Sequence, residues 1–277
     1  MYYKYDLKNG ILYDKNKFII PIIITIIACI GFNSEFQSAI KSGYADREAE
    51  FIDVLMYVLK GEKPFDPYNN EDFKFPFSWL INQLSIAFII GKYPLSELYD
   101  NHGAFVLIKG GSRRKWVLSK YLWIVTVCII YYLLILMTIL IFCKISGFAV
   151  SLELKTSQSF AFLTASKTFT GIKLIKILLL PLFTSIALSF MQTAISLVFQ
   201  SVYGFAFVLG VCGISIYSNS IWAIGNCSLL MRNEQFNYSD INTDKALILL
   251  CTIIIISFLF SIIYFDRYDI LRGRREN

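Results

Sequence analysis

The chain has 277 residues, of which 56% are hydrophobic, 16% aromatic and only 17% charged, and its formal net charge is +6. An ordinary soluble domain has about 45–50% apolar and about 25% charged residues, so this composition excludes a typical soluble enzyme domain and indicates a membrane protein. Membrane topology and anionic lipid headgroups account for the basic excess, so we expect no nucleic-acid partner.

Six apolar runs are candidates for membrane-spanning helices. A spanning helix needs roughly 20 mostly apolar residues, because the hydrocarbon core is about 30 Å thick. Four runs reach that length without a charge, and two shorter runs can span if their polar flanks snorkel or the bilayer thins. The long runs are residues 121–143, 177–200, 203–226 and 246–265, and the short ones are residues 18–32 and 77–91.

These runs predict an all-α membrane protein: a single transmembrane domain over residues 1–277, with about six helices and an extracytoplasmic helical loop between the first two. Lysine and arginine are enriched in cytoplasmic loops, which predicts a multi-pass protein of the bacterial cell membrane with both termini cytoplasmic. Lys173 and Lys176 lie near an outer membrane edge and oppose this bias. The cytoplasmic segments would be residues 1–17, 92–120 and 266–277, and the outer loops residues 33–76 and 144–176.

The N-terminal residues 1–17 mix tyrosine with lysine, which suits a segment in the inner headgroup layer; a frayed tail is the alternative. The run that follows ends in Cys29, as a bacterial lipoprotein signal does, but the further spans favour an uncleaved signal-anchor helix. All six cysteines fall in or at the ends of apolar runs without a CxxC spacing, so we interpret them as small buried hydrophobes.

The loop over residues 33–76 is the largest polar segment and contains a predicted helix at residues 46–60. Acidic residues crowd its start, Phe51 and Leu55 share one face, and Gly61 followed by Pro64 supplies a stop. Such an amphipathic helix lies on the outer leaflet or caps the spans. The alternative is a loop stabiliser without a ligand.

Asn82 and Gln83 place amides inside the second apolar run, and Trp79 marks its outer end. Amides in hydrocarbon usually bond a neighbouring helix and sometimes line a path. Helix packing is the preferred interpretation, and a translocation path is the alternative.

The segment over residues 92–120 is polar, basic and punctuated by glycine. Pro94 is expected to break the helix that leaves the membrane, and residues 95–107 to form a short helix along its surface. Arg113 and Arg114 would then lie at the inner headgroup level. On charge alone, these residues anchor the chain by the positive-inside rule.

The same segment resembles the loop between the second and third helices of the ABC export-permease superfamily, which carries an E…G…L…SR…K pattern. The matching positions are Glu97, Gly103, the apolar run 105–108, Ser112, Arg113 and Lys120. The resemblance implies that residues 97–109 dock into a groove of an ATP-binding subunit. It implies an ATPase-coupling set of Glu97, Asp100, Gly103, Ser112, Arg113, Arg114 and Lys120.

This resemblance extends coarsely over the whole chain, in its number of spans and its lack of a soluble enzyme domain. The long loop at residues 33–76 departs from common members of the superfamily, which keep that loop short, so the subfamily and the substrate stay open. The resemblance implies that ATP and Mg²⁺ are bound by partner subunits and that this chain carries no cofactor of its own. It also implies pairing with a second permease, identical or related.

The fourth apolar run carries a polar stripe. Its residues follow one another at spacings of four, three and four, which puts them on one helical face. A polar stripe in lipid should face protein or a water-filled route, so it indicates either a translocation path or interhelical packing. The stripe consists of Ser185, Ser189, Gln192 and Ser196.

In the fifth run, Gly204, Gly210 and Gly213 allow close helix approach, and polar residues from Ser215 to Ser220 suit a helix that turns back before fully crossing. The permease resemblance favours this interpretation. The sixth run is rich in isoleucine and has no polar feature.

Several catalytic classes are excluded. The sequence has no GxxxxGK[ST] phosphate loop, so this chain does not bind ATP in that manner. His102 is the only histidine, and no acidic residue lies within a predicted span. An intramembrane metalloprotease would therefore lack its metal ligands. A proton-coupled carrier would lack the ionisable groups that it needs at membrane depth. We therefore predict no catalytic or metal-binding residue.

The predicted function is that of the permease subunit of an ATP-driven ABC exporter, moving a peptide or an amphiphile by alternating access. The alternative is a membrane immunity or sensor protein that binds a peptide or partner through residues 33–76.

Overall fold

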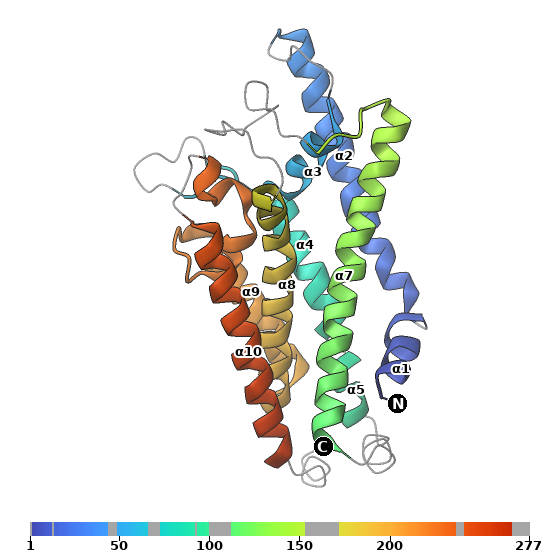
Figure 1. The fold of residues 1–277 in the computed structure, drawn as a ribbon, viewed down its shortest axis with the longest axis vertical. Helices are drawn as coiled ribbons and strands as arrows, with labels where there is room; N and C mark the ends of the chain where they lie inside the picture. Colours follow the sequence, from blue (N-terminus) through green and yellow to red (C-terminus); the bar gives the residue numbers. More distant parts are fainter. Residues whose placement is uncertain are drawn as a thin grey trace.

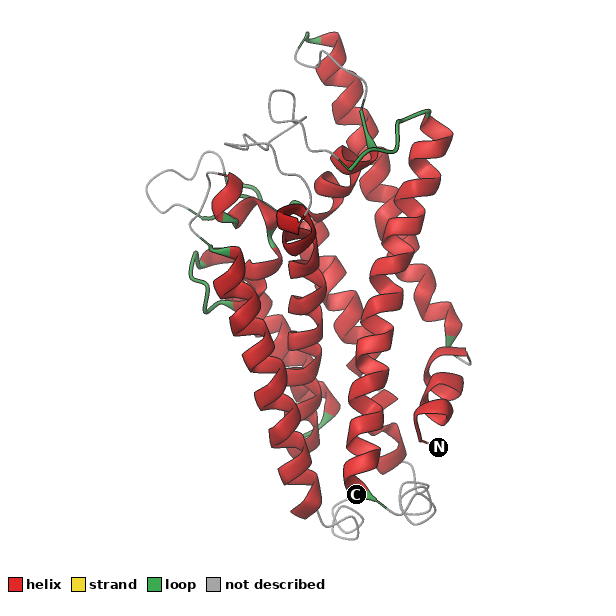
Figure 2. Cartoon of the chain, viewed as in Figure 1, coloured by secondary structure: helices red, strands yellow, loops and turns green. Residues whose placement is uncertain are grey.

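A computed structural model describes residues 2–12, 14–43, 49–65, 73–91, 93–99, 112–152, 172–236 and 241–267. These residues form helices, turns and two isolated β-bridges, with no strand among them (Figure 2). The long helices are α2 (Ile19–Lys41), α4 (Phe77–Gly91), α7 (Arg113–Ser146), α8 (Ile172–Val198), α9 (Ser201–Tyr217) and α10 (Thr243–Arg267). The short elements are α1 (Tyr2–Leu7), η1 (Lys8–Leu12), η2 (Lys15–Phe18), α3 (Phe51–Leu59), α5 (Tyr93–Tyr99), η4 (Ile224–Ser228), η5 (Leu230–Arg232) and η6 (Glu234–Phe236).

The long helices lie side by side along the long axis of the molecule (Figure 1). The end that carries α1, α5, the start of α7 and the end of α10 is called the lower end here, and the end that carries α3 is called the upper end. Helix α8 is central, because it packs against α4, α7, α9 and α10 and is the most buried of the long apolar helices. The core therefore forms around α8.

Four described helical stretches are long and apolar enough to cross a membrane: Lys15–Lys41, Arg113–Ser146, Leu174–Val198 and Thr243–Arg267. Helices α4 and α9 have 15 and 17 residues, which is at or below the usual minimum for spanning. The structure confirms an all-helical fold with membrane-type helices, and the total of six spans stays a prediction. Exposed isoleucines on the outer faces, among them Ile23 and Ile27 of α2 and Ile255 and Ile256 of α10, suit contact with lipid.

Three helix boundaries differ from the prediction. The first apolar run was expected to end at residue 32, but α2 continues to Lys41 because Phe32 and Phe36 pack against Phe148 beyond α7. The expected helix at residues 46–60 is α3 over its described part, beginning only after Glu50. The backbone N–H of Glu50 donates to Asp53 Oδ2 over 2.9 Å in a capping box, which sets that start.

The expected fifth run, residues 203–226, is helical only to Tyr217. The expectation of a helix that turns back before fully crossing stays a prediction. Helix α4 ends at Gly91, as expected. Pro94 lies in the first turn of α5, where its missing N–H is tolerated, and most of the short helix expected at residues 95–107 lies outside the described residues.

Helix α7 has well-defined stops at both ends. Ser112 is its N-cap, and its side chain accepts a bond from the backbone N–H of Lys115 over 3.4 Å. Gly147 follows the last turn with φ of 74°, the left-handed conformation that glycine adopts without strain. These caps fix a helix of 34 residues that runs the length of the bundle.

The cysteines are free thiols, five of which are buried, as expected. Cys251 is exposed on α10 instead, because that helix turns one face away from the bundle.

Candidate functional site

The polar stripe of α8 faces the interior of the bundle. All four of its side chains are buried. Three of them are serines whose hydroxyls donate to the carbonyl four residues earlier: Ser185 to Pro181 over 3.0 Å, Ser189 to Ser185 over 2.7 Å and Ser196 to Gln192 over 2.7 Å. This back-bonding satisfies the donors within the helix, so the hydroxyls sit inside an apolar bundle at little cost.

Side chains of α4 and α7 complete a polar layer beside the stripe. The Ser185 hydroxyl, whose one hydrogen is also within reach of the Pro181 carbonyl, lies 3.0 Å from Gln83 Oε1 and 2.9 Å from the Tyr132 hydroxyl. Tyr131 donates to Asn82 Oδ1 over 3.0 Å. The expected path residues of α4 and α8 therefore meet across the bundle.

The two tyrosines were missed by the sequence analysis. They stand adjacent in the middle of an apolar run, and a phenolic hydroxyl at that position needs a polar partner. This was the signal that could have indicated them. Their adjacency lets α7 reach two neighbours at once, with Tyr131 bonded to α4 and Tyr132 to α8.

Gln192 is the least satisfied member of the stripe. Its Nε2 donates to the carbonyl of Ala87 in α4 over 2.9 Å. Its Oε1 is buried and has no hydrogen-bond partner among the described residues. A buried oxygen in that state costs about 1–3 kcal/mol, so Gln192 is a poor choice for packing alone.

We expect Gln192→Met to change the free energy of unfolding by less than about 1 kcal/mol, because the lost bond to Ala87 is offset by removal of an unpaired oxygen. Thermal unfolding in detergent measures this, with Ser189→Ala as the matched control in the same stripe. A large loss of stability for Gln192→Met alone would show that the amide is a packing element. A Gln192→Met variant that is stable but impaired in transport would assign the Gln192 amide to the translocation path.

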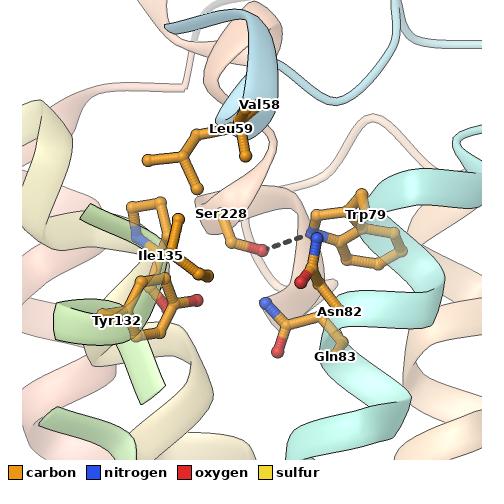
Figure 3. Close-up of a pocket in the computed structure, with 9 residues that line it drawn as sticks. Val58, Leu59, Trp79, Asn82, Gln83, Tyr132, Ile135 and Ser228 are labelled. Atoms are coloured by element: carbon orange, nitrogen blue, oxygen red, sulfur yellow. Dashed lines mark hydrogen bonds between the residues drawn. The ribbon is translucent and has the colours of Figure 1, made fainter. Parts of the chain in front are cut away.

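A small cavity lies above this polar layer (Figure 3). The space open to the centre of a water molecule is about 20 Å³, which is room for about one water and far too little for a peptide. Its upper boundary is formed by Leu59 of α3 and Ser228 of η4, and the indole Nε1 of Trp79 donates to Ser228 Oγ over 2.7 Å. Its lining residues are Val58, Leu59, Trp79, Asn82, Gln83, Tyr132, Ile135, Pro181 and Ser228.

The basic residues at the start of α7 lie at the lower end, where they hold the end of α10. Arg113 donates to the carbonyl of Asp266 over 2.9 Å, which places a cation at the negative end of the α10 dipole. Arg114 bonds the carboxylate of the same residue over 2.7 Å, and its side chain is 74% exposed. A partner could therefore reach Arg114, whereas Arg113 already caps a helix.

Lys120 does not face outward, as a coupling residue of this chain would. It is buried, and its Nζ lies 2.6 Å from Asp6 Oδ1. The Asp6 carboxylate also accepts bonds from Ser119 and, over 3.1 Å, from Tyr93. In this conformation the carboxylate of α1 holds the ammonium of Lys120 inside the bundle, so the coupling role that the resemblance implies for Lys120 stays a prediction.

The remaining coupling positions are only partly placed. The backbone of Glu97 lies in α5, and Asp100 and Gly103 lie outside the described residues. Ser112 forms the cap described above. The structure thus brings together α1, α5, the start of α7 and the end of α10, and the sequence analysis had no signal for Asp6.

At the upper end, Lys176 of α8 pairs with Asp244 of α10 over 2.7 Å. Both side chains are substantially exposed, so this pair contributes little stability. The pairing with Asp244 gives Lys176 a partner at the membrane edge that was expected to be outer and therefore poor in basic residues.

Comparison of the sequence with protein-family models gives no match, and searches of the curated proteins and of the solved structures find no significantly similar chain.

Proposed function

We propose that this chain is the permease subunit of an ATP-driven exporter of the bacterial cell membrane, with about six spans and both termini cytoplasmic. Separate subunits would bind ATP and Mg²⁺, and a second permease would complete the route. The substrate class that fits best is a peptide or an amphiphile. Transport by alternating access would pass along the polar layer of α4, α7 and α8.

The observation that carries the proposal is the pairing of two features in one bundle. A polar layer crosses the apolar bundle, and it includes the buried Oε1 of Gln192, which has no hydrogen-bond partner in the described part of the chain. At the lower end, the segment that resembles a coupling loop is hydrogen-bonded to the end of α10 and, through Tyr93 and Lys120, to α1. Such bonds would pass a push on α5 to several helices at once.

The cavity is too small for a substrate, so this conformation would be a closed one. Two permeases that rock apart could open a wider route between them. Nothing in the polar layer provides a titratable carboxylate in the described residues of α4, α7 or α8, which favours an external energy source over proton coupling.

The test is affinity purification of the chain in mild detergent, with mass spectrometry and an ATPase assay on the eluate. We expect a stoichiometric partner of soluble-ATPase size. The double variant Arg114→Glu/Lys115→Glu should reduce that partner at least tenfold while membrane insertion is unchanged. Lys245→Glu, an equally exposed lysine at the upper end, is the matched control and should retain the partner.

Retention of the ATPase by Arg114→Glu/Lys115→Glu, and by deletion of residues 97–108, would contradict the coupling assignment. A chain that purifies alone, or with a partner held by residues 33–76, would favour the immunity or sensor function instead.

A further inference from the structure

Residues 224–232 form a buried segment without a regular helix at the upper end. The turns η4 and η5 lie in this segment, and every residue from Ile224 to Arg232 is buried. Element η4 packs against α8 and α9. A buried backbone outside regular structure must find its hydrogen bonds elsewhere, so each bond that holds this segment can be traced.

The bonds between this segment and the walls of the bundle are few. The backbone N–H of Gly225 donates to Ser215 Oγ over 3.1 Å, and Trp79 donates to Ser228 as described. The approach at Gly225 is close, since a Cβ there would lie 2.6 Å from Ser215 Oγ. Apart from the bonds made by Arg232, the segment is thus tightly fitted but lightly bonded to α4 and α9.

Arg232 holds the segment in place from one end. Its guanidinium is fully buried and donates to the carbonyls of Ser215 over 2.5 Å and Ile216 over 3.0 Å. It also donates to Asn226 Oδ1 over 2.6 Å, which ties η5 back to η4. These acceptors are neutral, and the carbonyls belong to the last turn of α9, where the helix dipole favours a cation.

The same side chain reaches the loop that follows α3. Its Nε lies 3.3 Å from the carbonyl of Glu62 and its Nη2 lies 3.4 Å from that of Lys63. The adjacent Met231 donates its backbone N–H to the carbonyl of Lys60 over 2.9 Å. Desolvation by burial lowers the pKa of Arg232 to about 10, and no carboxylate among the described residues pairs with its guanidinium.

These contacts join the two halves of the upper boundary of the cavity. One half is α3 with Leu59, and the other is η4 with Ser228. Arg232 bonds Asn226 within η4, and the carbonyls of Glu62 and Lys63 just beyond α3. The charged guanidinium of Arg232 is bonded to neutral acceptors, and hydration by water competes with these bonds. Water can therefore replace the acceptors of Arg232 when the two halves separate.

We propose that residues 224–232 are a gate over the polar cavity and that Arg232 is the latch that keeps it closed. The gate rests on the proposed transport function for its purpose, since it would open to release substrate at the upper end. Its mechanics concern this chain alone. Once Arg232 is released, the backbone bond from Met231 to Lys60 is the tie that must still break before η4 separates from α3 and Ser228 meets water.

Thiol labelling tests the gate. In a chain whose six native cysteines are replaced, Ser228→Cys reports the gate and Ser220→Cys, at an exposed position, reports the side of the membrane. Intact cells are treated with a membrane-impermeant maleimide. We expect little labelling of Ser228→Cys while Arg232 is present, and labelling at least tenfold faster when Arg232→Gln is added. Labelling of Ser220→Cys should not change with Arg232.

A folded Arg232→Gln protein in which Ser228→Cys stays unlabelled would overturn the latch. If Arg232→Gln does not fold, Asn226→Ala removes one acceptor and should still accelerate labelling severalfold; no acceleration in that folded variant counts against the gate equally. If Ser220→Cys is labelled only in inverted vesicles, the upper end faces the cytoplasm and the proposed orientation of the chain is wrong. The labelling of Ser228→Cys is then compared in inverted vesicles.

Cross-linking separates this proposal from the transport function. Because the contact between these residues runs through the long indole of Trp79, the two thiols of Trp79→Cys and Ser228→Cys are joined by a short reducible bifunctional thiol reagent. This cross-link should abolish export, reversibly on reduction, while the ATPase still co-purifies. If Ser228→Cys is labelled as expected but no ATPase co-purifies with the chain, the gate is supported and the exporter function is rejected. If the ATPase co-purifies and the cross-linked chain still exports fully, the exporter function is supported and the gate is rejected.

Discussion

Replacing Asp6 with alanine is expected to destabilise the lower end of the bundle by about 3–5 kcal/mol, because the buried Lys120 loses the carboxylate that it contacts over 2.6 Å. Both side chains are 2% exposed, and the carboxylate also accepts bonds from Ser119 and Tyr93. In a chain of this size that loss corresponds to roughly 6–20 °C in Tm, measured by thermal unfolding in detergent.

The control is the exposed pair of Asp14 and Lys17 in the same N-terminal segment, where the Asp14 side chain is 49% exposed. Asp14→Ala should change stability by less than about 1 kcal/mol, since solvent screens such pairs. The double variant Asp6→Asn/Lys120→Met keeps an acceptor for Tyr93 and removes both charges, so it should recover most of the loss. Equal stability of Asp6→Ala and Asp14→Ala would refute the buried pair.

The second large effect is expected from Gly204→Ala at the start of α9. A Cβ at Gly204 would lie 2.0 Å from Ser196 Oγ and 2.5 Å from the carbonyl oxygen of Gln192. The carbonyl belongs to α8 and cannot rotate away, so the turn between α8 and α9 must shift. Overpacking of this kind costs about 1–3 kcal/mol or more, again read as a lower Tm.

Gly210 in the same helix is the matched control, because a Cβ there meets nothing within 4 Å. Gly210→Ala should stabilise the helix by about 0.5–1 kcal/mol through the higher helix propensity of alanine. The two substitutions are chemically identical, so their opposite signs isolate the close approach of α9 to α8. A similar change in Tm for both variants would rule out that contact as the reason for Gly204.

Local patterns were sufficient to predict the helices and one polar face. Apolar runs and charge placement locate the membrane-type helices, because the hydrocarbon core acts on each run by itself. The spacing from Ser185 to Ser196 correctly placed those side chains on one face, since helical periodicity depends only on neighbouring residues. The N-cap at Ser112 and the stop at Gly147 were not predicted, although both depend on local chemistry.

Contacts between distant residues needed the tertiary structure. Asp6 meets Lys120, Tyr132 meets Ser185, and Arg232 meets the loop after α3 only because the helices that carry them pack together. The sequence did not indicate that Lys120 is buried, because the direction of a long side chain depends on where its partner lies in space. The sequence by itself determined which segments enter an apolar bundle, whereas the packing of that bundle decided which polar groups meet inside it.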